Sequence, residues 1–363
     1  MTEWADGRFG RRVLAAASWL TGPLSPDDYL GLLDPLWSGR HPAGRVAAVL
    51  PAGVGATTLV IRTGRGWNGH RAGQYLPVGV EIDGVRHWRT YSITSPPADA
   101  LTITVKARRG GRVSPHLVHR TRPGEVLRLG PAQGEFVLPR ALPDRLLFVT
   151  AGSGITPVMG MLRTLARSLG PGPAPHAVLL HSAPRPQECL FRGELAALRT
   201  RAAWLTTHLT YTRTGGGRLT PDRIAALCPD WRRRDAWVCG PPGLLDAAER
   251  SWAAAGVRQR LRVERFRLAP LPTGGGGAVG APVRFGRSGV EADAGASVPL
   301  LEVGEAAGVA MPYGCRRGIC FGCLAPLTEG RVRDLRTGEV RGEPGELIQT
   351  CVSAAAGPLV LDL

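Results

Sequence analysis

Four of the seven cysteines lie within the last 50 residues, at a spacing typical of metal ligands. Cys315, Cys320 and Cys323 form a C-x4-C-x2-C motif, and Cys351 follows further along the chain. Four thiolates, three from one tight loop and one from a distant element, are the ligand set of a [2Fe–2S] cluster. Zinc is the alternative, but zinc sites usually pair C-x2-C motifs or add histidines, and no histidine follows His208. The spacing therefore predicts a [2Fe–2S] cluster and a reducing compartment.

A glycine-rich turn near the middle of the chain is typical of a dinucleotide site. The apolar segment 146–150 runs into Gly152 and Gly154, which allow the backbone to approach a pyrophosphate closely. Thr156 and Pro157 then open a helix whose N-terminus offers free N–H groups to the phosphates. Proline replaces the last glycine of the usual fingerprint, so this turn alone is a partial match.

A C-G-P-P motif further along the chain strengthens the interpretation. Cys239, Gly240 and Pro241 end a later strand and open another helix. Such a position is the carboxyl edge of a wound sheet, where ligands bind. The alternative for Cys239 is a buried thiol at the end of a strand, with no role in binding.

The residues that follow two strands of this region bear on the choice of dinucleotide. NAD enzymes usually place an acid after the second strand, where it binds the ribose hydroxyls. Ser182 and Arg185 lie there instead, and Arg213 lies at the end of the next strand. Serine and arginine suit the 2′-phosphate of NADPH. The sequence favours NADPH and leaves NADH open, because surface arginines are common in this chain.

A third group of residues lies on segments that alternate like barrel strands. In the motif R-x-Y-S, Arg89 can neutralise a phosphate, Tyr91 can stack on an isoalloxazine ring, and Ser92 can face the flavin N5. Lys106 ends a later strand. A glycine loop then opens a helix suited to a pyrophosphate, with the residues Gly111, Arg112, Val113 and Ser114. The pattern predicts FAD and leaves FMN open.

Changes of pattern divide the chain into five segments. Residues 1–40 predict two helices. Short alternating runs over 41–140 are typical of an antiparallel barrel, and strands that alternate with helices over 141–266 are typical of a parallel sheet. Four consecutive glycines mark a linker at 267–281, and a small mixed domain follows at 282–363. The expected fold is multidomain α+β.

The N-terminal segment has two notable surfaces. In its second helix, Tyr29, Leu33, Leu36 and Trp37 share a face, and Tyr29, Leu33 and Trp37 suggest core contacts, so packing of both helices on the body of the protein is one interpretation. Basic and aromatic side chains further upstream suggest contact with an anionic lipid surface or a membrane partner: Trp4, Arg8, Phe9, Arg11, Arg12 and Trp19.

Charge and hydropathy exclude several classes of protein. The net charge is +16, but the basic residues are scattered, with few aromatics between them, so nucleic-acid binding is not indicated. The last 82 residues instead carry 8 arginines and 10 acids, which favours docking of an acidic tail domain onto a basic body. No segment approaches the ~20 apolar residues of a membrane span, and the run at 13–20 is too short for an export signal. The expected location is the cytoplasm, with peripheral contact to the inner membrane as an option.

The order of these motifs resembles the ferredoxin–NADP reductase superfamily over residues 41–266, and the cysteines resemble plant-type ferredoxins over 282–363. With its helical extension the chain is most similar to actinobacterial reductases that serve acyl-CoA Δ9-desaturases. The resemblance implies a flavin-binding barrel, an NAD(P)-binding domain and a β-grasp ferredoxin domain. It also implies that Tyr91, Ser92 and Cys239 act at the reaction centre, with Cys239 near the nicotinamide.

The function implied by this resemblance is electron transfer from NADPH, through FAD and the cluster, to an oxygen-activating acceptor. NADPH gives two electrons as hydride and a cluster accepts one at a time, so a flavin must lie between them. A membrane fatty acyl desaturase is the favoured acceptor. A Rieske oxygenase or a soluble diiron hydroxylase is an alternative, and a redox sensor without turnover is an alternative of another class.

Overall fold

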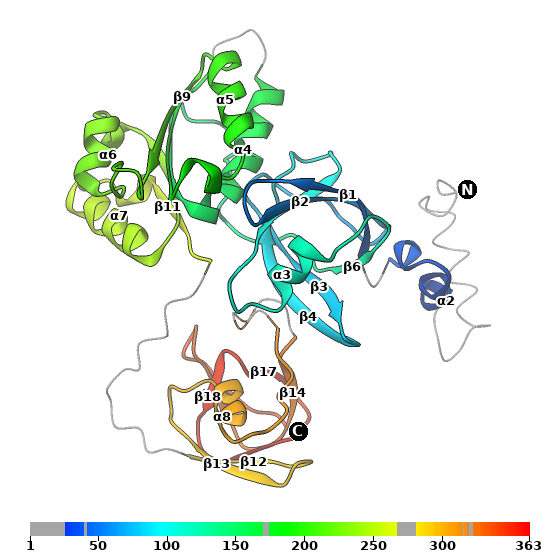
Figure 1. Ribbon diagram of the computed structural model, residues 1–363. Coiled ribbons are helices and arrows are strands. Elements are labelled where there is room, and N and C mark those ends of the chain that lie inside the picture. Colours follow the sequence, from blue (N-terminus) through cyan, green and yellow to red (C-terminus); the bar gives the residue numbers. More distant parts are fainter. Residues whose placement is uncertain are drawn as a thin grey trace. The chain divides into compact units, whose positions relative to one another are not determined.

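The computed structural model describes residues 26–39, 42–169, 174–266, 281–314, 316, 318 and 322–363. The chain divides into two compact units, residues 1–80 with 91–265 and residues 81–90 with 266–363 (Figure 1). The predictions for residues 1–25, for most of the linker, and for Cys315 and Cys320 lie outside the described residues.

An antiparallel barrel forms the first part of the fold. Its sheet has the order β4-β3-β6-β1-β2-β5, and a bridge between Ile93 and Ile103 joins the end of β4 to β5. Inward-facing side chains such as Leu59 and Ile61 are fully buried, which follows from the alternation seen in the sequence. The elements are β1 (Ala43–Pro51), β2 (Ala56–Thr63), β3 (Tyr75–Ile82), β4 (Val85–Ser92), β5 (Leu101–Lys106), α3 (Val113–His119) and β6 (Val126–Leu129).

A five-stranded parallel sheet follows, in the order β11-β10-β7-β8-β9. Helices α4 and α5 cover one face and α6 and α7 the other, as Figure 1 shows. Because the chain runs from β7 out to β9 and then returns to β10, the topology switches between β7 and β10, where such sheets bind ligands. The strands are β7 (Arg145–Ala151), β8 (His176–Ala183), β9 (Leu205–Tyr211), β10 (Asp235–Cys239) and β11 (Leu261–Glu264). The helices are α4 (Ile155–Ser168), α5 (Arg192–Arg201), α6 (Pro221–Leu227) and α7 (Pro242–Ala254).

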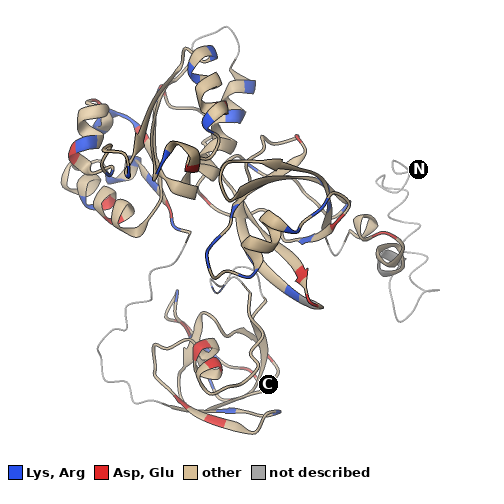
Figure 2. Cartoon of the chain, in the orientation of Figure 1, with Lys and Arg blue, Asp and Glu red and all other residues tan. Residues whose placement is uncertain are grey.

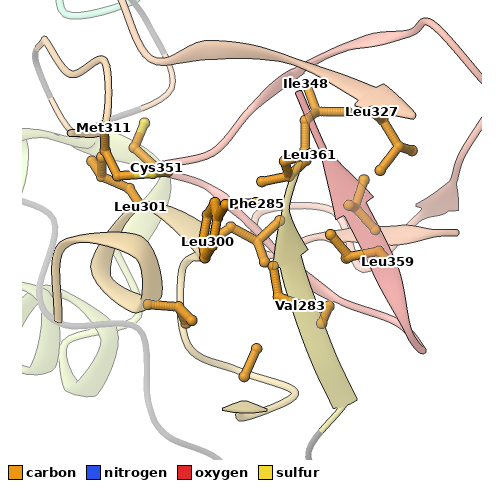
Figure 3. Close-up of a cluster of buried hydrophobic side chains, with 14 of the residues drawn as sticks. Val283, Phe285, Leu300, Leu301, Met311, Leu327, Ile348, Cys351, Leu359 and Leu361 are labelled. Carbon is orange, nitrogen blue, oxygen red and sulfur yellow. The ribbon is translucent and has the colours of Figure 1, made fainter. Parts of the chain in front are cut away.

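The C-terminal domain packs one short helix, α8 (Leu300–Ala306), against two small sheets. Its core contains Phe285, Leu300 and Leu361, and Cys351 lies within it beside Met311 (Figure 3). One sheet has the order β13-β12-β19-β14-β17 and the other β16-β15-β18. Their strands are β12 (Ala281–Phe285), β13 (Val290–Ala294), β14 (Leu324–Glu329), β15 (Val332–Asp334), β16 (Val340–Arg341), β17 (Leu347–Gln349), β18 (Ser353–Ala355) and β19 (Leu359–Leu361). The predicted barrel, parallel sheet and C-terminal sheet domain are therefore all present.

The charges follow the asymmetry expected from the sequence. In Figure 2, acidic residues gather on α8 and β13 of the C-terminal domain, and basic residues gather on helices of the parallel-sheet domain. The acids of α8 are Glu302 and Glu305, and α5 ends in Arg199 and Arg201.

The segment before the barrel corrects one prediction. Helix α2 (Pro26–Leu33) ends after about two turns, and the carboxylate of Asp34 then accepts the N–H of Leu36 at 3.0 Å. This cap starts a 3-10 turn that breaks the helical period, so Leu36 is buried at 7% exposure. Tyr29, Leu33 and Trp37 are 44%, 77% and 42% exposed, so the prediction that they are core contacts is wrong.

A buried histidine on β8 makes stability depend on pH. The imidazole of His181 is fully buried, and its Nδ1 lies 2.8 Å from the hydroxyl of Thr150 on β7. Burial lowers the pKa of His181 to about 4. The unfolded chain therefore binds an extra proton between pH ~6.5 and the folded pKa, and stability is lost as pH falls through that window.

We expect the free energy of unfolding to fall by about 3 kcal/mol between pH ~6.5 and ~4 because of His181 alone. Urea unfolding followed at several pH values measures this slope. His181→Gln should remove it, whereas the control His119→Gln, at an exposed position, should retain it. An equal slope in wild type and His181→Gln would contradict the assignment.

Candidate functional site

The two predicted dinucleotide motifs meet at the switch point of the parallel sheet. Gly152, after β7, has a φ of 57°, a conformation that favours glycine. Gly154 lies against the end of β10, where a Cβ atom would stand 2.2 Å from the carbonyl oxygen of Cys239. Only glycine at position 154 lets the two turns pack together, so the sequence motifs are parts of one site.

A cleft of about 540 Å³ opens beside these turns. Of the predicted site residues, Gly152, Ser182 and Pro241 line it. The full lining comes from the carboxyl ends of the strands and the helix starts that follow: Ala151, Gly152, Ser182, Ala183, Pro184, Thr212, Arg218, Leu219, Thr220, Pro221, Pro241, Gly243, Leu244 and Ala247. The position and the size of the cleft suit a nucleotide.

Arg218 is a candidate phosphate ligand that the sequence reasoning missed. All three arginines are exposed, but Arg218 lines the cleft, whereas the predicted Arg185 and Arg213 do not. A tight turn brings Arg218 there: Gly216 donates its N–H to the carbonyl of Tyr211 at 2.9 Å, and a Cβ on Gly216 would lie 2.7 Å from the same oxygen. The signal was three glycines, 215–217, between a strand and an arginine.

Four other predicted residues lie in the turns themselves. Thr156 donates its hydroxyl to the carbonyl of Ser153 at 2.9 Å, and Pro157 lies in the buried first turn of α4. Cys239 has no exposed surface, and Gly240 packs against Ala151. These residues shape the site, and their contact with a nucleotide stays a prediction.

Helix α4 connects the dinucleotide turn directly to the end of the R-x-Y-S strand. A Cβ on Gly160 would lie 2.7 Å from the carbonyl oxygen of Ile93, just after β4. Arg163 donates to the carbonyl of Thr94 at 2.7 Å and forms a two-pronged ion pair with Glu194. The helix that opens the nucleotide site is thereby fixed against the strand that carries Tyr91 and Ser92.

The predicted flavin residues offer the groups that a flavin nucleotide needs, and several already have partners. Ser92 is buried at 7% exposure on β4, and Arg89 donates to the carbonyl of Trp88 at 2.7 Å. The ammonium group of Lys106 lies 3.5 Å from the carboxylate of Glu188. Ser114 accepts the N–H of Arg108 at 3.1 Å, which closes the loop of Gly111, Arg112 and Val113. A phosphate near Lys106 would compete with Glu188.

Two of the predicted cluster ligands are described, and they lie together. The sulfur atoms of Cys323 and Cys351 are 3.2 Å apart, and both residues are buried. Thr350 donates its N–H and its hydroxyl to the carbonyl of Cys323, at 3.2 and 2.9 Å, which fixes one cysteine to the residue that precedes the other. Sulfur ligands ~2.3 Å from a tetrahedral metal lie about 3.8 Å apart, so a separation of the two sulfurs by about 0.6 Å would let this pair share one iron of a cluster.

The backbone around the pair also fits a negative cluster. Gly318 donates its N–H to the sulfur of Cys351 at 3.3 Å, which favours the thiolate. Elsewhere in the described chain, Cys189 and Cys228 are buried without such support, and burial raises their thiol pKa values to about 11. They remain protonated at neutral pH, so they are poor metal ligands.

Family models match three successive segments of the chain. An oxidoreductase FAD-binding domain matches residues 59–138, an oxidoreductase NAD-binding domain matches 148–250, and a 2Fe-2S iron–sulfur cluster binding domain matches 284–356. The predicted FAD, NAD(P) and [2Fe–2S] domains are confirmed by these matches.

Two relatives and one solved structure extend the comparison over most of the chain. An NADPH oxidoreductase of Mycobacterium tuberculosis is 47% identical over 354 residues, covering 96% of this chain and 91% of the relative. A stachydrine N-demethylase reductase subunit of Rhizobium meliloti is 30% identical over 301 residues, covering 76% and 83%. Phthalate dioxygenase reductase has a similar fold, with a TM-score of 0.58, 24% identity, and coverage of 89% of this chain and 98% of the other.

Replacing Cys323 with alanine removes one of the four thiolates. We expect the variant to lose its iron, its acid-labile sulfide and the electron paramagnetic resonance signal of the dithionite-reduced protein, while it keeps its flavin. Cys228→Ala is the matched control, because it also removes a buried thiol. An unchanged signal in Cys323→Ala would reject the ligand assignment.

Proposed function

Because this chain belongs to the ferredoxin–NADP reductase superfamily, as a member with a C-terminal [2Fe–2S] domain, we propose that it passes electrons from NADPH to a membrane fatty acyl desaturase. It is an NAD(P)H-dependent FAD/[2Fe–2S] reductase of the oxygenase type, and the predicted superfamily and enzyme class are confirmed. The donor, the acceptor and the roles of single residues are our proposals.

The protein's part in this chemistry is alignment rather than acid–base catalysis. The bound flavin supplies the conversion of a two-electron hydride into single electrons. Gly160 and Arg163 hold α4 against the end of β4, so the dinucleotide site and the flavin strand keep one geometry. In this arrangement Tyr91 and Ser92 would hold the ring of a bound flavin, and Cys239 would lie on the nicotinamide side.

The phosphate groups of the two cofactors have candidate partners. For the flavin we propose Arg89, Lys106 and the loop of Gly111, Arg112, Val113 and Ser114. For the dinucleotide we propose the two glycine turns, with Gly152, Gly154, Thr156, Pro157, Gly240 and Pro241. Each turn offers backbone N–H groups, which suit phosphate oxygens.

The charges of the residues that line the cleft support our proposal that the protein prefers NADPH to NADH. None of the described residues that line it is acidic, so the usual partner of the NAD ribose hydroxyls is missing from this lining. Ser182 and Arg218 lie there instead, and Arg185 and Arg213 follow the neighbouring strands. The NADPH oxidoreductase of M. tuberculosis is consistent with this choice.

A desaturase acceptor is supported by the exposed apolar surface before the barrel. Tyr29, Leu32, Leu33 and Trp37 are all between 42% and 77% exposed. Exposed patches of this kind mark contacts with membranes or partner proteins. No helix within the described ranges is long and apolar enough to cross a membrane, so we propose peripheral contact through this patch. A Rieske oxygenase or a soluble diiron hydroxylase is the second candidate, since several relatives are named as monooxygenase reductases.

Arg218→Ala tests the choice of nucleotide. Loss of a charge-assisted contact costs ~1.5–3 kcal/mol, so we expect the KM for NADPH to rise roughly ten- to a hundredfold. The KM for NADH should scarcely change, because NADH lacks the 2′-phosphate. Arg185→Ala should act in the same direction, and Arg250→Ala, at an exposed position on α7, serves as the control. A wild-type protein that prefers NADH would reject the proposal.

Leu32→Ser combined with Leu33→Ser tests the membrane partner. Cytochrome c reduction by NADPH should persist, because neither leucine is among the residues that we propose for a cofactor site. Turnover coupled to a desaturase in native membranes should fall several-fold, because the apolar contact is weakened. Val54→Ser alters another exposed apolar side chain and should have no effect. Equal coupling in all variants would exclude the patch, and negligible cytochrome c reduction would favour a redox sensor.

A further inference from the structure

Arg336, on the turn after β15, is fixed in place by three partners. Its guanidinium forms two contacts with the carboxylate of Asp334, at 3.0 and 2.6 Å. It also donates to the side-chain oxygen of Gln349 at 3.3 Å and to the carbonyl oxygen of Gly318 at 3.0 Å. Asp334 and Gln349 are themselves buried, so the guanidinium has one well-defined orientation.

Gly318 lies in the predicted cluster loop and touches this guanidinium closely. Its φ is 69°, and a Cβ atom there would lie 2.6 Å from Nη1 of Arg336 and 2.9 Å from Cγ2 of Val352. The same peptide segment donates the N–H of Gly318 to the sulfur of Cys351 at 3.3 Å. The arginine therefore holds the carbonyl of the residue whose N–H contacts a ligand sulfur.

From this geometry we infer that Arg336 is a positioning residue for the cluster: by fixing Gly318, it directs an N–H at the sulfur of Cys351 and raises the reduction potential of the cluster. One-electron reduction adds one negative charge to the cluster and its thiolates. A donor aimed at a sulfur stabilises the more negative state more strongly, and such bonds tune the potential of iron–sulfur proteins. The inference rests on the [2Fe–2S] site and not on the proposed donor or acceptor.

The competing explanation is that the positive charge of Arg336 acts directly on the reduction potential of the cluster. The structure argues against this explanation. The side chain of Arg336 is 40% exposed, so water and salt screen its charge. The carboxylate of Asp334 lies within 3.0 Å and cancels much of that charge at a distance. The hydrogen bond from Gly318 to Cys351 is buried and is not screened in this way. Geometry, rather than charge, is therefore the larger effect.

Two substitutions separate position from charge. Arg336→Met removes both, and Arg336→Lys keeps the charge but loses the planar fork that binds Asp334 and Gly318 together. Arg333→Met is the matched control, because Arg333 is an exposed arginine of β15, just before this turn, and its guanidinium contacts Gly338 instead. The cluster potential of the whole, cofactor-loaded protein is measured by titration with dithionite, followed by electron paramagnetic resonance.

We expect Arg336→Met and Arg336→Lys to lower the equilibrium constant for cluster reduction about tenfold, a shift of about 59 mV for one electron. Arg333→Met should match wild type. The oxidised cluster of both Arg336 variants should also lose iron to a chelator faster than that of Arg333→Met. If Arg336→Met alone fails to assemble a cluster while retaining its flavin, the positioning role is supported. The reduction potential is then measured on Arg336→Lys instead.

Two results would overturn the inference. A wild-type potential in Arg336→Lys, with a lowered one in Arg336→Met, would mean that charge is what matters. Potentials in both variants equal to that of Arg333→Met would mean that Arg336 has no influence on the cluster. Because dithionite is the reductant, neither result depends on NADPH or on the acceptor, so a failure here is distinguishable from a failure of the proposed function.

Discussion

The geometry of the reaction site depends on a close backbone contact between Gly154 and the carbonyl group of Cys239. A Cβ at position 154 would lie 2.2 Å from that oxygen, so a side chain would push the turn after β7 away from β10. The same turn starts α4, and a second glycine, Gly160, brings that helix against the carbonyl of Ile93 on the barrel. These two glycines therefore determine how the nucleotide cleft and the flavin strand are oriented relative to each other. This alignment is what hydride transfer requires of the protein.

The C-terminal unit meets a different constraint, because it must hold thiolates inside an apolar core. Cys323 and Cys351 are buried, and burial alone would keep a thiol protonated, as it does for Cys189 and Cys228. Backbone donors offset this cost, and the bond from Gly318 to Cys351 is the described example. The metal site and its support therefore form one structure, in which the glycine loop is as necessary as the sulfur atoms.

The sequence predicted those features that local spacing determines. The cysteine motif, the glycine turns and the change from barrel to parallel sheet are each indicated by short local patterns. The fold class followed from these patterns. Arg218 was missed because its place in the cleft depends on how three glycines turn the chain after β9. Leu36 was separated from Tyr29 and Leu33 by the cap at Asp34, which ends the helical period. Arg336 lies 18 positions after Gly318, and nothing in the sequence indicates that the two meet.

The central claim is that electrons from NADPH reach the C-terminal cluster through the flavin. The most direct measurement mixes the purified protein with stoichiometric NADPH under anaerobic conditions, and follows flavin absorbance together with rapid-freeze electron paramagnetic resonance. We expect the flavin to bleach first and the signal of the reduced [2Fe–2S] cluster then to rise at the expense of reduced flavin. Bleaching of the flavin without that signal, in protein whose cluster dithionite reduces, would contradict the central claim.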